Sequence, residues 1–256
     1  MIQYIKKDLT KLYNIGDALC APDVYFDIAS ESNRTIIGGG VWNIPDYQKK
    51  PGATNMIVWA AGKSDKDIRR ILPVRSYTRF LEWSSRDLDL LEDKSKFLPC
   101  ASCLNTKIIS EPHGDKTLIF TNVNQVVSSE IDSNLSEDYI LAKNDETEES
   151  FLAKWKQCGR VITNSYHGIY WSLLSGREVN PFGYSSKFTS VTHLFGIEFP
   201  KENLYDIKNR SAVSNMIEKH NGKFIKPVTN PLEQFRELNL EFADKLKTHG
   251  VVCKLK

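Results

Sequence analysis

The chain has 256 residues, of which 41% are apolar and 26% are charged, a balance typical of a folded globular protein and unlike disordered, collagen-like or coiled-coil sequences. Its 34 basic and 32 acidic residues leave a formal net charge of +2 without a basic stripe, which argues against a nucleic-acid-binding protein. The sequence has no apolar run of about 18 residues, so we expect no transmembrane helix.

The first half of the chain alternates short apolar runs with segments of helical spacing. Buried strands are expected at Met1–Ile5, Thr35–Ile37 and Met56–Ala61, and the last two are followed directly by glycine. Helices are expected at Asp17–Ala29 and Asp65–Leu72. Strands that alternate with helices in this way predict a parallel α/β sheet.

The second half of the chain repeats this alternation. Strands are expected at Thr117–Thr121 and Arg160–Thr163, and helices at Phe151–Gln157 and His167–Leu174. The segment Glu130–Glu149 is rich in acidic residues and poor in apolar ones, so we expect a solvated surface excursion there.

A cluster of proline, glycine and charged residues at Ser110–Lys116 separates the two halves. We place a domain boundary at this cluster, which gives an N-terminal domain at residues 1–112 and a C-terminal domain at residues 113–256.

The clearest helix is expected at residues 231–247. Asn230 is suited to its N-cap and Pro231 to its first helical position, and Glu233 completes a pattern like a capping box. Its apolar residues form a single stripe of Phe235, Leu238, Phe242 and Leu246. We expect this stripe to pack back across the boundary toward the N-terminal domain.

The five cysteines are odd in number and mostly scattered, which favours reduced thiols and a cytoplasmic location. The N-terminus lacks the apolar core and cleavage site of a signal peptide, and its few lysines favour at most a peripheral contact with a membrane surface. Cys100 and Cys103 form the single Cys-x-x-Cys pair of the chain, and the nearest histidine is His113. We interpret the pair as structural thiols and expect no bound metal.

Two turns combine glycine with polar residues next to a helix or strand. At Asn14–Asp17, Gly16 permits close approach of a ligand, and the helix that follows offers N–H groups to an anion. The run Gly38–Gly40 ends a strand, where open α/β sheets bind ligands, and Trp42 just beyond it can stack on a sugar. Each turn by itself is a weak signal.

The third turn, Thr163–Gly168, places a histidine in the first turn of a helix. The helix dipole there disfavours a protonated ring and favours a bound anion. Because histidine transfers protons near neutral pH, His167 is a candidate acid–base group. A single histidine in this position is more often a capping or core residue. Asn164 and Ser165 favour a site, because together with the backbone they supply donors for a phosphate or a carboxylate.

In chain order, these turns resemble the motifs of the polysaccharide pyruvyl transferase family. The residues that carry the resemblance are Asn14-x-Gly16-Asp17, Gly38-Gly39-Gly40, Ser85-Arg86-Asp87, Pro99–Cys103, Thr163–Gly168 and Ser185–Phe188. The stretch VITNSYHGIYWSLLSGREV, residues 161–179, is especially similar to the C-terminal signature of that family. The resemblance extends over most of the chain, from residue 14 to residue 187.

The resemblance implies two Rossmann-like domains of the glycosyltransferase-B type, with the active site in the cleft between them. It implies transfer of a pyruvyl group from phosphoenolpyruvate to two hydroxyls of a saccharide, which can be lipid-linked, to form a ketal in surface-polysaccharide synthesis. Phosphoenolpyruvate is the donor substrate, and neither a cofactor nor a metal is expected.

The resemblance also assigns roles to residues of this chain. His167 matches the motif histidine and is the expected catalytic acid–base. The expected donor-binding residues are Ser165, Tyr166, Gly168, Lys187 and Arg86. The expected residues of the acceptor side or cleft lining are Asn14, Gly16, Asp17, Gly38, Gly39, Gly40 and Trp42.

One position departs from the family pattern. Many members carry an arginine two residues before the motif histidine, where this chain has Ser165. Such an arginine would bind the anionic groups of the donor, so another cation must do so here. Two alternatives stay open: a nucleotide-sugar-dependent glycosyltransferase of the same architecture, and a saccharide-binding relative without catalysis.

Overall fold

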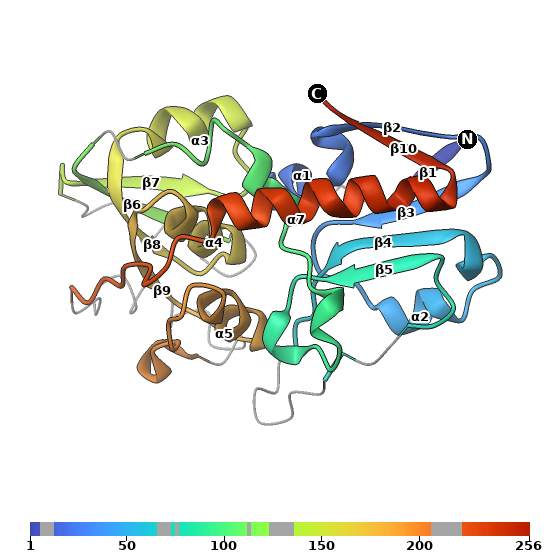
Figure 1. The fold of residues 1–256 in the computed structure, drawn as a ribbon. Helices are drawn as coiled ribbons and strands as arrows, with labels where there is room; N and C mark the ends of the chain where they lie inside the picture. The colour runs from blue at the N-terminus through green and yellow to red at the C-terminus, as the bar shows by residue number, and fades with distance from the viewer. Residues whose placement is uncertain (6–12, 66–72, 75–76, 112–113, 123–135, 206–221) are drawn as a thin grey trace.

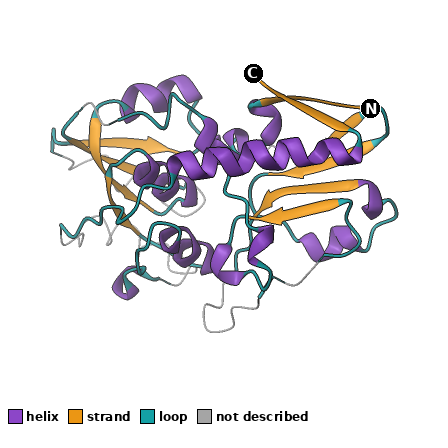
Figure 2. Ribbon diagram, viewed as in Figure 1, coloured by secondary structure: helices purple, strands orange, loops and turns teal. Residues whose placement is uncertain are grey.

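The chain folds as a mixed α/β protein in a computed structural model that describes residues 1–5, 13–65, 73–74, 77–111, 114–122, 136–205 and 222–256. Within these ranges the strands form two four-stranded parallel sheets and one two-stranded antiparallel ribbon (Figure 1, Figure 2). The predicted α/β fold with parallel sheets is therefore confirmed. In the same ranges, none of the helices combines the length and apolar character needed to cross a bilayer.

The first sheet has the strand order β1-β3-β4-β5, and every neighbouring pair is parallel. Its strands are β1 (Ile2–Ile5), β3 (Arg34–Gly38), β4 (Met56–Ala61) and β5 (Glu82–Ser85). All residues of β4 are buried, as expected of a strand covered on both faces. The three strands predicted in this region are confirmed, whereas β5 escapes prediction because its sequence, EWSS, has no apolar run.

Short helices connect these strands: α1 (Ile15–Leu19), α2 (Ile44–Gln48), and the 3-10 helices η1 (Pro22–Val24) and η2 (Ala53–Asn55). The helix predicted at Asp17–Ala29 is wrong, because α1 ends at Leu19 and the strand β2 (Phe26–Ser30) follows η1. Pro22 has no N–H with which to continue the helix. Of the helix predicted at Asp65–Leu72, residues 66–72 lie outside the described residues.

The second sheet has the order β7-β6-β8-β9 and is also parallel throughout. Its strands are β6 (Lys116–Thr121), β7 (Tyr139–Lys143), β8 (Cys158–Thr163) and β9 (Glu178–Pro181). The two strands predicted here are confirmed as β6 and β8. The prediction of a surface excursion at Glu130–Glu149 is wrong at Tyr139–Lys143, which form the edge strand β7. The short apolar run of this strand is flanked by the acidic residues that suggested a loop. Residues 130–135 lie outside the described residues.

The second sheet carries the helices α3 (Glu148–Trp155), α4 (Tyr166–Leu174) and α5 (Ser186–His193). The 3-10 helices η3 (Leu88–Leu90), η4 (Lys94–Lys96), η5 (Ala101–Leu104) and η8 (Lys201–Asn203) lie in the connecting segments. The α3 helix begins three residues before the predicted start, because the side chain of Thr147 caps it by accepting from the Ser150 N–H. The predicted helix at His167–Leu174 is confirmed as α4.

The long C-terminal helix α7 (Leu232–Lys245) is followed by η9 (Leu246–His249) and by β10 (Val251–Leu255), which pairs antiparallel with β2. The helix begins one residue later than predicted: Pro231 is its N-cap, and Asn230 accepts a hydrogen bond from the Leu232 N–H. Glu233 pairs with Arg236 at 2.7 Å and forms no capping box.

The apolar stripe of α7 reaches both sheets, and Figure 1 shows the helix running across them. Phe235 packs in the core around α4, whereas Phe242 and Leu246 pack in the core around Trp59 of β4. The predicted stripe is therefore confirmed. The predicted domain boundary, between residues 112 and 113, lies outside the described residues; the strands of the first sheet end at Ser85, and those of the second begin at Lys116.

Candidate functional site

A polar cavity of about 220 Å³ lies where the two sheets face each other. It is lined by Asn14, Asp17, Val41, Arg86, Asn122, Ser165, Tyr166, His167 and Lys187. Arg86 and Asn122 directly follow β5 and β6, and Ser165 lies just beyond β8. The carboxyl ends of strands from both sheets therefore supply the lining, which is the usual place for a ligand in parallel α/β proteins.

Arg86 is the most unusual residue of the polar cavity. Its side chain is only 2% exposed, and its Nε and Nη1 atoms are buried without a hydrogen-bond partner in the described part of the chain. The guanidinium lies over the ring of Tyr166, 3.7 Å from the centroid. Gly62 makes room for it, because a Cβ atom there would lie 2.3 Å from Nε. A buried charge with unpaired donors indicates a missing anionic partner.

Lys187 supplies a second cation from the first turn of α5. Its Nζ donates a hydrogen bond to the hydroxyl of Tyr184 at 3.2 Å. Burial, assisted by the positive charge of Arg86, lowers the pKa of Lys187 to about 8. An anion bound in the cavity would oppose both effects, so ligand binding would stabilise the charged amine.

His167 is the second residue of α4 and is only 6% exposed. Its ring lies between Tyr166 and Trp171, with centroids 5.2 and 5.3 Å away. Gly16 faces the ring closely, because a Cβ at Gly16 would lie 2.2 Å from Nδ1. Asn14 orders this approach by capping α1 through hydrogen bonds from the N–H groups of residues 16 and 17.

Two of the predicted donor-binding residues have other contacts. The hydroxyl of Ser165 caps α4 by accepting from the Gly168 N–H at 3.4 Å, although Ser165 still lines the polar cavity. Gly168 is not among the cavity-lining residues, because it packs against the sheet: a Cβ there would lie 2.4 Å from Oγ1 of Thr163. The structure gives Gly168 a role in close packing of α4 on the second sheet, and its role in donor binding stays a prediction.

The glycine run Gly38–Gly40 at the end of β3 has a structural role. A Cβ at Gly38 would lie 2.4 Å from the ring of Pro22, and one at Gly39 would lie 2.2 Å from Sγ of Cys20. Gly39 and Gly40 have φ values of 67° and 72°, a conformation that favours glycine. None of the three lines the polar cavity or the second cavity described next, and their place on the acceptor side stays a prediction.

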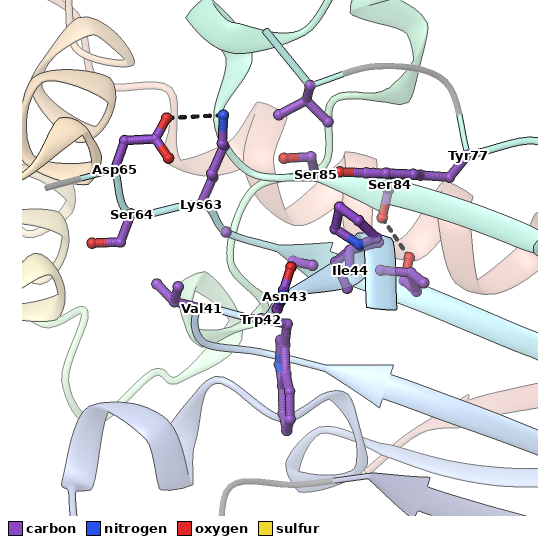
Figure 3. A pocket seen from close by; sticks show the side chains of 15 residues that line it. Val41, Trp42, Asn43, Ile44, Lys63, Ser64, Asp65, Tyr77, Ser84 and Ser85 are labelled. Atoms are coloured by element: carbon purple, nitrogen blue, oxygen red, sulfur yellow. Dashed lines mark hydrogen bonds and ion pairs between the residues drawn. The ribbon is translucent and has the colours of Figure 1, made fainter. Parts of the chain in front are cut away.

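A second cavity of about 270 Å³, the aromatic cavity, lies over the carboxyl ends of the first sheet (Figure 3). Its lining consists of Val41, Trp42, Asn43, Ile44, Pro45, Val58, Ala61, Gly62, Lys63, Ser64, Asp65, Val74, Tyr77, Ser84 and Ser85. Val41 lines both cavities, and Gly62 of the aromatic cavity packs against Arg86 of the polar cavity. The two cavities therefore adjoin. Trp42 donates its indole N–H to the carbonyl of Gly39, which fixes the ring.

The segment Lys63–Asp65 joins the aromatic cavity to α5. Lys63 and Asp65 form an ion pair at 2.8 Å, drawn in Figure 3. Ser64 donates to the hydroxyl of Ser185 at 2.8 Å, and the backbone N–H of Asp65 donates to the hydroxyl of Ser186 at 2.9 Å. The N-terminus of α5, which carries Lys187, is thus tied to the first sheet.

Three further residues of this region were not among the expected site residues, although two of them belong to the motifs quoted above. Asn122 lines the polar cavity, and its position directly after β6 is the sequence signal for it. Asp87 is fully buried; its Oδ2 accepts from the Lys63 N–H, and burial raises its pKa to about 6 against the opposing charge of Arg86. Cys100, interpreted as a structural thiol, lies with its Sγ 3.7 Å from Nε2 of His167.

The described residues contain no group of three or more histidine, cysteine or acidic side chains that could hold a metal ion. Comparisons of the chain with protein-family models, with curated proteins and with solved structures find no match. The motif residues and the geometry of the two cavities therefore carry the functional argument.

Proposed function

We propose that the protein transfers a pyruvyl group from phosphoenolpyruvate to two hydroxyls of a saccharide, forming a pyruvate ketal in surface-polysaccharide synthesis on the cytoplasmic side of the membrane. In this proposal the two parallel sheets are two Rossmann-like domains of the glycosyltransferase-B type, and the polar cavity is the cleft between them. The observation that carries the proposal is the buried guanidinium of Arg86, with two unpaired nitrogen atoms, in one cavity with Lys187 and the motif histidine.

Phosphoenolpyruvate carries a phosphate and a carboxylate, and the polar cavity offers a cation for each. Arg86 presents a planar group of N–H donors that matches either anion, and Lys187 presents a compact charge. Ser165 lacks the charge of the arginine that the family motif would place there, but Arg86, which belongs to another of the motifs, lines the same cavity. A guanidinium beside Ser165 supports retention of an anionic donor.

His167 is the proposed acid–base group. In its protonated form it gives a proton to the methylene carbon of the donor while an acceptor hydroxyl adds to the adjacent carbon. The neutral ring then accepts the proton that the added hydroxyl loses. The C–O bond to phosphate breaks, the second hydroxyl of the saccharide forms a bond to the same carbon, and its proton passes to the leaving phosphate, which closes the ketal ring.

The aromatic cavity suits the saccharide acceptor. Trp42 and Tyr77 provide aromatic surfaces, and Asn43 and Asp65 provide polar groups for hydroxyls. Because this cavity adjoins the polar cavity at Val41, an acceptor there would present its hydroxyls next to the donor.

The test is release of phosphate from phosphoenolpyruvate with a panel of saccharide acceptors. Replacement of His167 by Asn should lower turnover about 10²–10⁴-fold, the usual contribution of general acid–base catalysis, with donor affinity and melting temperature little changed. Near-normal turnover of His167→Asn would remove His167 from the mechanism.

Thermal unfolding in the presence of each ligand separates this proposal from its alternatives. A ligand at about 100 times its dissociation constant should raise the free energy of unfolding by about 2.7 kcal/mol. Stabilisation by phosphoenolpyruvate is expected. Stabilisation by a nucleotide sugar alone would favour a glycosyltransferase, and stabilisation by saccharides alone a binding protein.

A further inference from the structure

Cys100 is held rigidly beside the candidate catalytic histidine. Its Sγ lies 3.7 Å from Nε2 of His167, and both side chains are buried. The carbonyl of Cys100 accepts a hydrogen bond from the hydroxyl of Tyr170 on α4 at 3.0 Å. The Cys100 thiol also contacts the hydroxyl of Ser102, which accepts from the indole N–H of Trp171 at 3.0 Å. Two side chains of α4 therefore fix the position of Cys100 relative to the histidine of the same helix.

The charges around this pair favour a negatively charged sulfur. Burial opposes ionisation of Cys100, but hydrogen bonds from Cys20 and His167, together with the charges of His167 and Arg86, hold the pKa of its thiol well below the ordinary value. The thiol of Cys20 keeps its proton, because its hydrogen bond to Cys100 raises its own pKa. The titratable and charged groups that face the pair from the surrounding elements are Asp17, Cys20, Arg86, Cys103, Tyr166 and Tyr170.

We infer that Cys100 is a positioning residue for His167. The sulfur of Cys100 accepts a hydrogen bond from the Nε2–H group of the histidine ring. This bond holds the neutral imidazole in the tautomer that has its lone pair on Nδ1. Nδ1 lies on the side of α1, from which Asn14 and Asp17 line the polar cavity. With Nε2 bonded to sulfur, Nδ1 is the ring nitrogen left to exchange protons with substrate, and Gly16 of α1, which packs closely against Nδ1, must give way for that exchange.

The catalytic consequence rests on the proposed pyruvyl transfer. The imidazolium releases the proton of Nδ1 to the methylene carbon and keeps the proton of Nε2 on its bond to sulfur. Nδ1 then takes the proton of the acceptor hydroxyl, which restores the imidazolium. Cys100 forms and breaks no covalent bond in this sequence, and its charge stabilises the protonated ring.

The tautomer of His167 can be measured without reference to activity. We would label the protein with ¹⁵N-histidine, record long-range ring correlations of the neutral ring, and assign His167 by its loss in His167→Asn. The wild type should show the Nε2–H tautomer. In Cys100→Ala the ring loses the sulfur acceptor at Nε2 and should show a mixture of both tautomers. Cys103→Ala is the matched control, because Cys103 is buried nearby but contacts Asn239.

Turnover provides the second readout. Cys100→Ala should lose activity about tenfold to a hundredfold at unchanged donor affinity, as typical for groups that orient an imidazole. Cys100→Ser, whose hydroxyl also accepts from Nε2–H, should retain the tautomer and recover part of the activity. The Nδ1–H tautomer in the wild type, or an unchanged tautomer in folded Cys100→Ala, would overturn the inference. If the tautomer behaves as expected but no phosphate is released from phosphoenolpyruvate, the proposed function fails and the positioning role stands.

Discussion

At the scale of single residues, the polar cavity brings two cations together, with the carboxyls of Asp17 and Asp87 as the nearby negative charges. Arg86 is buried with two nitrogen atoms unpaired, and Lys187 lies in the same cavity with a lowered pKa. A folded protein without ligand is destabilised by such groups, because desolvation of a charge is repaid only by a well-placed partner. Both residues are therefore better explained by an anionic ligand than by stability.

Replacement of Arg86 by Met should separate binding from stability. A hydrogen bond to a charged group contributes about 1.5–3 kcal/mol, so the affinity for phosphoenolpyruvate should fall about tenfold or more. The melting temperature without ligand should change little, because the substitution removes two unpaired buried nitrogen atoms but also the positive charge that faces the buried carboxyl of Asp87. Calorimetric binding and thermal unfolding measure the two effects, with Arg160→Met, at an exposed site on β8, as the control. Unchanged donor affinity in Arg86→Met would contradict the role of Arg86.

The lowered pKa of Lys187 predicts how donor binding depends on pH. The amine is charged below its pKa of about 8 and becomes neutral above it, so the affinity for phosphoenolpyruvate should fall as the pH rises through 8. Lys187→Arg stays charged over this range and should lose the pH dependence while retaining affinity. Binding measured from pH 6 to pH 9.5 in both proteins provides the test. An equal decline in both would assign the titration to another group.

At the scale of elements, the site depends on a close approach between α1 and α4. The Cα atom of Gly16 faces the ring of His167, and no larger residue fits there in the present arrangement. The cap of α1 by Asn14 and the cap of α4 by Ser165 fix the starts of both helices. Short helices are marginal by themselves, so these caps and contacts maintain the geometry of the site.

Gly16→Ala should therefore reduce activity even though alanine favours a helix. Helix propensity alone would stabilise the variant by about 1 kcal/mol, but the added Cβ would lie 2.2 Å from Nδ1 and must displace the ring. Turnover should fall at least about tenfold, and the ring resonances of His167 should shift. Ala18→Gly is a matched control in the same helix, because it weakens the propensity of α1 without adding an atom near His167. A fully active Gly16→Ala variant would show that the approach of the two helices is not required.

Sequence patterns predicted the central elements better than the edges. Their apolar pattern can be recognised in the local sequence, because it extends over the whole element. This holds for the buried strands β3, β4, β6 and β8 and for the apolar stripe of α7. β2 could not be predicted in the same way, since its partner β10 lies more than 200 residues away. β5 and β7 lack a distinctive apolar run and depend on their neighbours in the sheet.

The sequence predicted those residues of the site that lie at or near the carboxyl ends of strands or in the turns before helices. His167, Arg86, Lys187, Asn14 and Asp17 meet in one cavity as the motif order implied. The glycines at 38, 39 and 168 show the limit, because a glycine that admits a ligand and one that admits another side chain have the same sequence signature. Cys100 was underestimated for a related reason: only the fold shows that it contacts His167.

At the scale of the whole molecule, α7 connects the two sheets through one polar residue as well as its apolar stripe. Asn239 is fully buried; its Oδ1 accepts from the indole N–H of Trp59 at 3.0 Å, and its Nδ2 donates to the carbonyl of Pro99 at 3.2 Å. Trp59 is in β4 of the first sheet, and Phe235, one turn before Asn239, packs with α4 on the second. The two halves should therefore unfold together.

Asn239→Ala tests this coupling. The variant leaves the indole N–H of Trp59 buried without an acceptor, which should lower the free energy of unfolding by about 1–3 kcal/mol. Since α7 belongs to both cores, the loss should move a single transition rather than release one half. Denaturant unfolding is followed by tryptophan fluorescence in proteins that retain only Trp59 or only Trp155, with Phe at the other four tryptophan positions, so that each protein reports on one sheet. At low denaturant, Asn239→Ala should bind phosphoenolpyruvate with the same affinity as the wild type, because Asn239 does not line the polar cavity. Two separate transitions in the wild type would show that the sheets are independent units and that α7 does not couple them.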